Sequence, residues 1–248
     1  MALQRFFKEN PKLALAFSGG VDSAYLLYAA KAYGADVMAY YVKTPFQPEF
    51  EYEDAMRLAR ELKAEITTIH LDILADKTIT ENPKNRCYFC KKRIFSAISE
   101  QAKADGYFLI IDGTNASDDA ADRPGIAALT ELAVRSPLRE CGLTKADIRR
   151  LSKEAGLFTH DKPAYACLAT RIPTGTPITA EKLSITEDSE NFLRELGFSD
   201  FRIRMMGSAA KMQIPENQHP LLLTHRKAIL EKLKNHYTEV LLDLEVRQ

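Results

Sequence analysis

The segment 16–23 reads A-F-S-G-G-V-D-S and combines two glycines, two serines and an aspartate in a short stretch. A short apolar run precedes it and a periodic apolar run follows it, which predicts a strand, a tight turn and the start of a helix. Glycines let the backbone approach a ligand closely, and the amide groups of a first helical turn favour an anion. A phosphate site is therefore expected here. A serine-capped helix without a ligand is the alternative.

Cysteines form the second reactive group. Cys87 and Cys90 make a C-x-x-C pair at the predicted start of a helix with basic neighbours, and Cys167 lies further along the chain. A helix amino terminus and nearby cations favour the thiolate, which binds metals or attacks sulfur. Three thiolates could hold a [4Fe–4S] cluster with one open iron, whereas zinc would need Cys141 or a histidine as fourth ligand. Redox or persulfide chemistry is a third alternative, and Cys141 is interpreted as a small hydrophobic residue.

Two arginines and an acidic segment complete the candidate groups. The strand predicted over 201–206 alternates its side chains, so Arg202 and Arg204 share one face. Paired guanidinium groups suit a phosphate or a carboxylate through bidentate hydrogen bonds, and an ordinary charged surface is the alternative. The acidic residues Asp118, Asp119 and Asp122 fit either a solvated loop or a contact to ATP, metal or substrate.

The elements around these residues predict two domains. Strands expected at 13–17, 35–42, 65–73 and 107–111 alternate with helical patterns at 51–63 and 88–103. This order predicts an α/β fold with an open parallel sheet, whose ligands gather at the carboxyl ends of its strands. A linker rich in helix-breaking residues places the domain boundary after residue 162. Helices at 179–196 and 218–236, with strands at 201–206, 210–214 and 238–247, predict a small α+β domain over 163–248.

Composition limits the classes of function. The chain has 248 residues, of which 46% are hydrophobic and 27% charged, as in ordinary soluble globular proteins. Acidic and basic residues number 34 each, so no general positive field indicates a nucleic acid partner. The first ten residues lack an apolar signal core, and no apolar run reaches membrane-spanning length. We therefore expect a cytoplasmic protein without a membrane partner, whose cysteines bind metal or react.

Seven motifs in this order span most of the chain: S-G-G-V-D-S, N-R-C-Y-F-C-K, D-G-T-N, R-P-G, S-P-L-R-E, K-P-A-Y-A-C-L-A-T-R and R-I-R. Together they resemble the LarE family of ATP-dependent sulfur transferases, which are N-type ATP pyrophosphatases with a PP-loop of the form S-G-G-x-D-S. The resemblance implies that ATP is cleaved between its α- and β-phosphates to adenylate a carboxylate of pyridinium-3,5-biscarboxylic acid mononucleotide. That carboxylate would become a thiocarboxylate, on the route to the nickel-pincer nucleotide cofactor.

The resemblance also implies roles for individual residues. ATP would be bound by residues of the PP-loop and of two further strand ends, namely Phe17, Ser18, Gly19, Gly20, Asp22, Ser23, Val42, Gly113 and Thr114. Asp22 would also hold Mg²⁺. Arg202 and Arg204 would bind the phosphate of the substrate, with Arg171 and Glu190 as further substrate contacts.

The family draws its sulfur from two sources. Some members sacrifice a lone cysteine, whereas members that also carry C-x-x-C bind a [4Fe–4S] cluster through three cysteines and place sulfide on its open iron. This chain resembles the second type through Cys87, Cys90 and Cys167. Sulfide or another sulfur donor would then be a partner. The family commonly forms trimers of dimers, which implies a homo-oligomer.

Two other classes of function fit a PP-loop. A cluster-dependent tRNA thiolase would need a basic surface or an added RNA-binding domain, and its binding would depend strongly on salt. An amide-forming ligase or a nucleotide-binding regulatory protein would carry no cluster, and the regulator would release no pyrophosphate.

Overall fold

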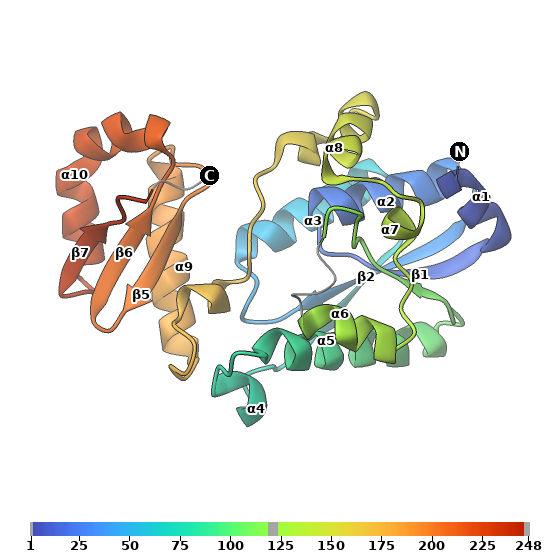
Figure 1. Ribbon diagram of the computed structural model, residues 1–248, viewed down its shortest axis with the longest axis horizontal. Helices are drawn as coiled ribbons and strands as arrows, with labels where there is room; N and C mark the ends of the chain where they lie inside the picture. The colour runs from blue at the N-terminus through green and yellow to red at the C-terminus, as the bar shows by residue number, and fades with distance from the viewer. Residues whose placement is uncertain (1, 119–123, 246–248) are drawn as a thin grey trace. The chain divides into compact units, whose positions relative to one another are not determined.

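The computed structural model describes residues 2–118 and 124–245, and Figure 1 labels their helices and strands. The chain forms two compact units. The first unit comprises Met1–Thr44, Glu49–Ile73 and Asn85–Lys162, and the second comprises Pro45–Pro48, Leu74–Lys84 and Pro163–Gln248. Two short segments from the first half of the chain therefore belong to the second unit, which a break at 163 alone does not predict.

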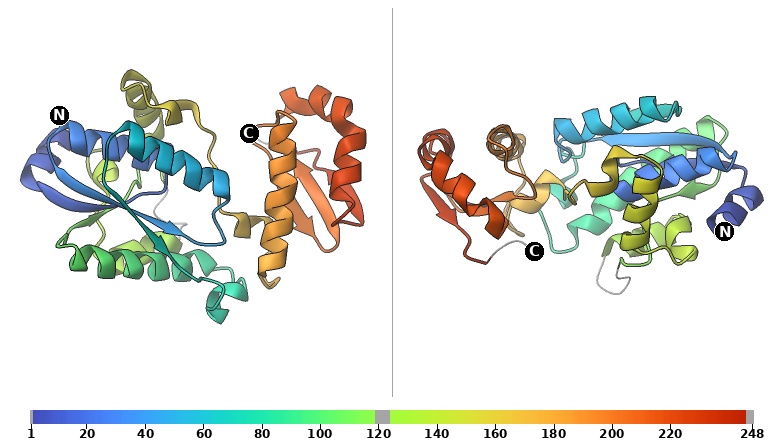
Figure 2. Two further views of the ribbon diagram at one scale, coloured as in Figure 1. Left: turned by 180° about the vertical axis from the view of Figure 1, so that it is seen from behind. Right: turned by 90° about the horizontal axis from the view of Figure 1, so that it is seen from above.

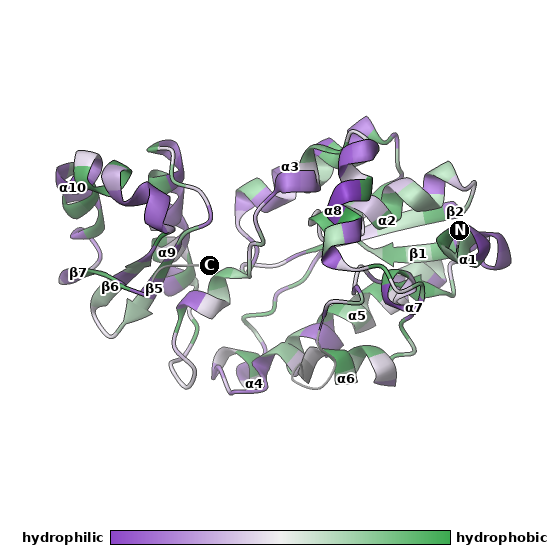
Figure 3. Ribbon diagram, turned by 45° about the horizontal axis from the view of Figure 1, so that its top comes forward, coloured by the Kyte–Doolittle hydropathy of each residue, from purple (hydrophilic) through white to green (hydrophobic). Residues whose placement is uncertain are grey.

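A parallel sheet forms the centre of the first unit. Within the described residues its order is β3-β2-β1-β4, with β1 (Lys12–Ala16), β2 (Asp36–Lys43), β3 (Ile66–His70) and β4 (Ile110–Ile111). Figure 3 shows β1 as largely hydrophobic, and most residues of β1 and β2 are buried, as expected for parallel strands that are covered on both faces. The predicted α/β class with a parallel sheet is thus confirmed.

Helices cover both faces of this sheet (Figure 1). The helices of the first unit are α1 (Ala2–Glu9), α2 (Val21–Ala32), α3 (Glu49–Glu61), α5 (Arg86–Ala104), α6 (Pro124–Glu131), α7 (Pro137–Glu140), α8 (Lys145–Glu154) and the 3-10 helix η1 (Phe158–Asp161). On one face Leu13 and Leu15 of β1 pack with residues of α2, α3 and α8. On the other face Ala14 packs with residues of α5 and α6. Successive side chains of β1 therefore enter two different hydrophobic cores, one on each face of the sheet.

The fourth strand is shorter than the range 107–111 that the sequence predicts. The backbone amide of Tyr107 donates to Ala102 at the end of α5, at 2.7 Å, so the chain is still leaving the helix there. The next side chain, Phe108, is 78% exposed and packs on neither face of the sheet. Only Ile110 and Ile111 pair with β1. The first part of this prediction is therefore wrong.

The second unit is an α+β structure, as the sequence predicts. Its described residues form a sheet of order β5-β6-β7, with β5 (Arg202–Met206), β6 (Ala209–Gln213) and β7 (Glu239–Leu242). β5 and β6 are antiparallel, whereas β6 and β7 are parallel. The helices α9 (Ala180–Glu195) and α10 (His219–Leu233) lie on one face of this sheet (Figure 2). Shorter helical turns are α4 (Lys77–Thr80), η2 (Leu168–Arg171) and η3 (Glu216–Gln218).

The ends of these elements follow from local hydrogen bonds. Thr179 caps α9, because its side chain accepts from the backbone amide of Lys182. The last strand ends at Leu242 rather than at 247, and residues 246–248 lie outside the described residues. Among the described helices, none is long and apolar enough to cross a membrane.

Asn82 holds the linker of the second unit. Its side chain is buried, and its amide donates to the backbone carbonyls of Ile172, Pro173 and Thr176 at 3.3, 2.8 and 3.1 Å. Its own carbonyl accepts from Gly175, and its φ is +57°, a region that asparagine tolerates better than alanine. We expect Asn82→Ala to lower the free energy of unfolding by about 2–3 kcal/mol, because buried carbonyls lose their donors.

Urea unfolding followed by circular dichroism measures this change. Asn235→Ala is the matched control, since Asn235 is an exposed asparagine of the same unit. Its effect should stay within about 0.5 kcal/mol. Equal midpoints for the two variants would contradict a structural role for the Asn82 amide.

Candidate functional site

The turn between β1 and α2 is closed by its own serines. The Ser23 hydroxyl lies 3.1 Å from the Ser18 hydroxyl and donates to the Gly20 carbonyl at 3.2 Å. Gly19 has a φ of +74°, in the left-handed region that favours glycine, and a Cβ there would lie 2.8 Å from the Cβ of Ala55. The turn can therefore follow this path only with glycine at 19.

The start of α2 is open to an anion. Its N-cap is Gly20, which has no side chain to make a capping hydrogen bond, and the Ser18 hydroxyl oxygen accepts from the Gly20 amide at 3.4 Å. The N-cap is therefore a glycine and not a serine. The amide groups of a first helical turn need partners, and an anion supplies them in the field of the helix dipole. This geometry supports the expected phosphate site.

A second loop packs on this helix start. β2 and β4 pair with β1 on opposite sides, so the order in which strands are added to the sheet reverses between β1 and β4. Ligands of such sheets bind at this switch point. A Cβ on Gly113, just after β4, would lie 2.9 Å from the backbone nitrogen of Ser23. The buried Asp112 accepts from the hydroxyls of Thr114 and Ser136 at 2.5 and 2.6 Å. The structure thus brings the PP-loop and the D-G-T-N turn together.

The remaining predicted ATP residues have different surroundings. Val42 lies near the carboxyl end of β2 and is buried in the core between the sheet and α5. Asp118 accepts from the backbone amide of Asn115 at 3.0 Å and so helps to close the loop after β4. Three residues named from the sequence, Asp119, Asp122 and Arg123 of the R-P-G motif, lie outside the described residues.

Asp22 has two partners that the sequence did not reveal. Lys145 Nζ lies 2.6 Å from one carboxylate oxygen of Asp22, and the Asn115 amide donates to the other at 3.3 Å. Lys145 is the first residue of α8, which Thr144 begins with a capping box. The T-K-A-D sequence indicates this helix start, but nothing in it shows that the lysine reaches Asp22. Lys145 adds a cation to the PP-loop edge.

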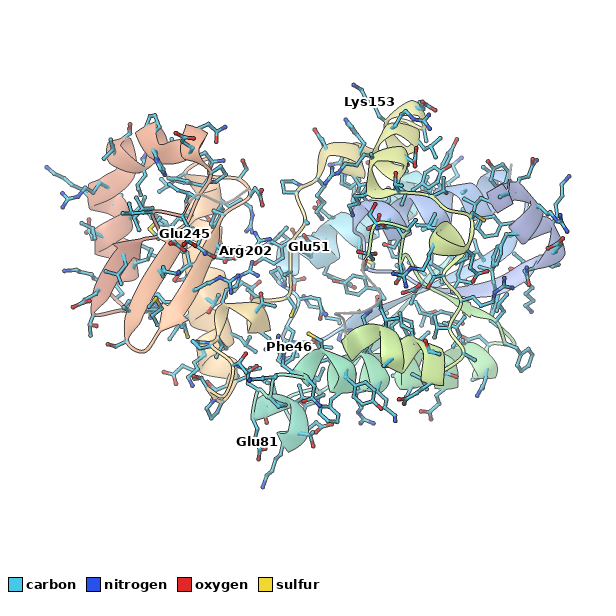
Figure 4. The ribbon with its side chains drawn as sticks, in the orientation of Figure 1. Phe46, Glu51, Glu81, Lys153, Arg202 and Glu245 are labelled. Carbon is cyan, nitrogen blue, oxygen red and sulfur yellow. The ribbon has the colours of Figure 1, made fainter. Side chains whose placement is uncertain are left out.

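We expect Lys145→Met to weaken ATP binding about tenfold, because a charge-assisted contact of this kind is worth about 1.5 kcal/mol. Isothermal titration calorimetry measures the dissociation constant of ATP directly. The matched control is Lys153→Met, since Lys153 is an exposed lysine near the other end of α8 and is labelled in Figure 4. An ATP affinity equal to that of the control would show that Lys145 only pairs with Asp22.

The cysteines are distributed over both units. Cys87 is exposed and Cys90 half-buried within the first five residues of α5, and Cys167 is half-buried just before η2 of the second unit. All four cysteines lie in the described part of the chain, and none forms a disulfide. Cys141 packs against the core of the first unit, and burial raises the pKa of its thiol, which agrees with a hydrophobic role. Over 2–118 and 124–245, no group of three or more His, Cys, Asp or Glu side chains is arranged to hold a metal ion.

The arginines of β5 bind the backbone of the second unit. Arg202, labelled in Figure 4, is 3% exposed and donates to the carbonyls of Phe201 and Ala164 at 2.6 and 2.5 Å. Arg204 is half-buried and donates to the Gln213 side chain and to the Thr170 carbonyl at 2.6 and 2.8 Å. The alternative of an ordinary charged surface is therefore wrong for Arg202.

Arg171 and Glu190 form a buried ion pair. The guanidinium Nε and Nη2 lie 2.8 and 3.1 Å from the two carboxylate oxygens, and both side chains are at most 1% exposed. Burial opposes the charge on Arg171, but the hydrogen bonds and the charge of Glu190 outweigh it and raise the pKa of the guanidinium. The carboxylate also accepts from the backbone amide of Ile203 at 2.9 Å. Both residues are predicted from the sequence as substrate contacts, but no sequence pattern indicates that they pair.

The closed S-G-G-V-D-S turn at the switch point of a parallel sheet is consistent with a PP-loop domain. It is 27% identical to the tRNA-specific 2-thiouridylase MnmA of Clostridium perfringens over 190 residues, 61% of this chain and 53% of that protein. No family model matches the chain.

Two further relatives are more similar. A pyridinium-3,5-bisthiocarboxylic acid mononucleotide synthase of Lactiplantibacillus plantarum is 34% identical over 211 residues, which are 84% of this chain and 76% of that enzyme. An uncharacterised protein of Synechocystis is 38% identical over 219 residues, which are 87% of this chain and 81% of that protein. The chain belongs to the LarE family and is an ATP-dependent sulfurtransferase, which confirms the resemblance seen in the sequence.

Proposed function

We propose that the enzyme adenylates a carboxylate of pyridinium-3,5-biscarboxylic acid mononucleotide and converts it to a thiocarboxylate for synthesis of the nickel-pincer nucleotide. The observation that carries this proposal is the uncapped amino end of α2 behind the closed turn, which suits the pyrophosphate of ATP. The name of the Lactiplantibacillus plantarum relative, a synthase of the bisthiocarboxylic acid mononucleotide, supports the choice of acceptor.

The first step is an adenylation. A carboxylate oxygen of the acceptor would attack the α-phosphorus of ATP, and the bond from that phosphorus to the oxygen bridging to the β-phosphate would break. The released pyrophosphate would be bound by the backbone amides of the first turn of α2, beside the hydroxyls of Ser18 and Ser23. Asp22 would hold Mg²⁺ against the phosphates after exchanging its bond with Lys145. Phe17, Val42, Gly113 and Thr114 would surround the nucleoside and the α-phosphate.

The second step is a thiolation. A sulfide nucleophile would attack the acyl carbon, and AMP would leave with the electron pair of the broken acyl–oxygen bond. Arg202 and Arg204 would hold the phosphate of the acceptor on the domain that begins at residue 163, whereas Arg171 and Glu190, expected as further contacts, are buried and paired with each other and so do not reach it. Sulfide or another sulfur donor would be consumed in each turnover, and we further propose a cytoplasmic homo-oligomer that binds no nucleic acid.

The sulfur would come from a [4Fe–4S] cluster held by Cys87, Cys90 and Cys167. The donor set fits such a group, because the three residues are thiols and two of them lie at the amino end of α5, where the helix dipole favours thiolates. Bound there, the cluster would supply a renewable sulfide on the iron that has no cysteine ligand.

Mass spectrometry of the acceptors tests the reaction. The anaerobically reconstituted chain is mixed with ATP, magnesium, sulfide, and either the pyridinium mononucleotide or tRNA. We expect sulfur on the pyridinium carboxylate and equal amounts of AMP and pyrophosphate. Sulfur on tRNA alone would replace this proposal with the thiolase alternative, and an amide product would indicate a ligase.

Absorbance spectroscopy tests the cluster separately. Reconstituted protein should show a broad iron–sulfur absorbance that disappears in Cys87→Ala, Cys90→Ala and Cys167→Ala. Cys141→Ala is the matched control, and its absorbance should equal that of the wild type. An unchanged absorbance in all of these variants would overturn the ligand assignment.

A further inference from the structure

Tyr165 lies at the centre of a group of arginines in the second unit. The guanidinium carbons of Arg171, Arg202 and Arg194 lie 4.5, 5.0 and 6.0 Å from the centre of its ring. Its hydroxyl donates to the Glu190 carboxylate at 2.5 Å. Burial and the charge of Glu190 raise the pKa of the phenol, so Tyr165 is a neutral donor. One side chain therefore contacts a carboxylate and three cations.

The same arginines hold the backbone around Cys167. Arg202 donates to the Ala164 carbonyl at 2.5 Å, and Arg171 donates to the Ala166 carbonyl at 2.8 Å. The backbone amide and the hydroxyl of Thr170 both donate to the Cys167 carbonyl, at 3.0 and 2.8 Å. These bonds fix the chain before the cysteine and at the cysteine itself.

The ring of Tyr165 explains how these arginines can lie close together. Guanidinium groups repel one another, and Glu190 supplies one negative charge to the cluster. The electron-rich face of an aromatic ring attracts cations, and this attraction is stronger where water is excluded. Ala164 and Ala166, on either side of Tyr165, are exposed, so this ring is the part of the segment that reaches inward.

We propose that Tyr165 is a positioning residue for Cys167. Its ring and hydroxyl keep Arg171 and Arg202 in the orientations in which they bind the carbonyls before the cysteine, and thereby fix the direction of the thiol. The inference rests on the proposed function in one respect, because it gives Cys167 a role in sulfur delivery. The positioning itself is a property of the chain and is measurable without the reaction.

The test is the rate at which iodoacetamide alkylates Cys167 in the full-length chain, without iron or ATP, followed by mass spectrometry of peptides. We expect Tyr165→Leu to raise this rate roughly tenfold, because the segment around Cys167 is released. Tyr165→Phe keeps the ring and should raise the rate roughly threefold. Cys141, which is also half-buried, is the internal reference in every sample. A wild-type rate in Tyr165→Leu would overturn the proposal.

Tyr107→Phe is the matched control, because it also removes one hydrogen bond from a tyrosine to a carboxylate, here that of Asp36 at 2.9 Å, in the first unit. Its rate at Cys167 should equal that of the wild type. Urea distinguishes positioning from simple destabilisation, since alkylation through unfolding of the unit depends steeply on urea and a local release does not. A steep dependence in both Tyr165 variants would overturn the positioning role.

Failure of the reaction and failure of this inference give different results. If wild-type protein transfers no sulfur but Tyr165→Leu alkylates at the expected rate, the proposed function fails and the positioning stands. If sulfur transfer is observed, Tyr165→Phe should lower kcat and leave the KM for ATP unchanged, because ATP binds to the first unit. A rise in the KM for ATP as large as the fall in kcat would count against positioning.

Discussion

Replacing Glu190 with alanine should lower the free energy of unfolding of the second unit by about 3–5 kcal/mol, because it leaves the charge of Arg171 buried and unpaired. The Arg171 side chain has no exposed surface, so water cannot replace the carboxylate. The backbone amide of Ile203 and the hydroxyl of Tyr165 lose the same acceptor. Urea unfolding followed by circular dichroism measures the effect, with the two units fitted as separate transitions.

An exposed ion pair on the same helix is the control. Asp188 of α9 lies 2.8 Å from Lys232, and the two side chains are 45% and 32% exposed. Asp188→Ala should cost less than about 1 kcal/mol, as exposed pairs generally do. The double variant Arg171→Leu with Glu190→Leu should cost less than the sum of the two single variants, because neither charge is left alone. A loss for Glu190→Ala as small as that for Asp188→Ala would contradict this account.

The elements that sequence predicts well are those with continuous apolar runs. β1 and β2 are such runs between polar segments, and each is buried on both faces. The first part of the strand expected at 107–111 does not form, because apolar side chains alone do not pair a strand, and Phe108 is exposed to solvent. The strand expected at 238–247 is too long for a related reason, because among the described residues β7 lies at the edge of the sheet beside β6 and ends at Leu242.

The candidate site shows the same division between local and distant contacts. The PP-loop is contiguous, so its closed turn follows from the residues of one short segment. Lys145 and Asp22 lie 123 positions apart in the sequence, and a chain of this composition offers many other lysines to one aspartate. The sequence predicts Arg171 and Glu190 as separate contacts, because residue types and spacing do not show which distant side chains pair. Pairs of this kind depend on the packing of the fold.

Replacing Gly19 with alanine should lower the rate of ATP–pyrophosphate exchange about 100-fold, because a displacement of about 1 Å in a catalytic loop has effects of this size. Two causes act together. The φ of +74° is strained for alanine, and the new Cβ would lie 2.8 Å from the Cβ and 3.1 Å from the Cα of Ala55 in α3. Either the turn or the helix must move, and a movement of the turn displaces the expected phosphate site. Exchange of labelled pyrophosphate into ATP, with the pyridinium acceptor present, measures the effect.

Gly34→Ala separates backbone strain from collision. Gly34 has a φ of +78°, but a Cβ there meets no atom within 4 Å among the described residues. This control should lower stability by about 1–2 kcal/mol, the cost of the left-handed conformation, and leave exchange unchanged. Adding Ala55→Gly to Gly19→Ala removes the nearest atom of the collision and should restore part of the exchange rate, since the contact with the Cα remains. If Ala55→Gly restores nothing, strain in the turn rather than contact with α3 makes glycine necessary at position 19.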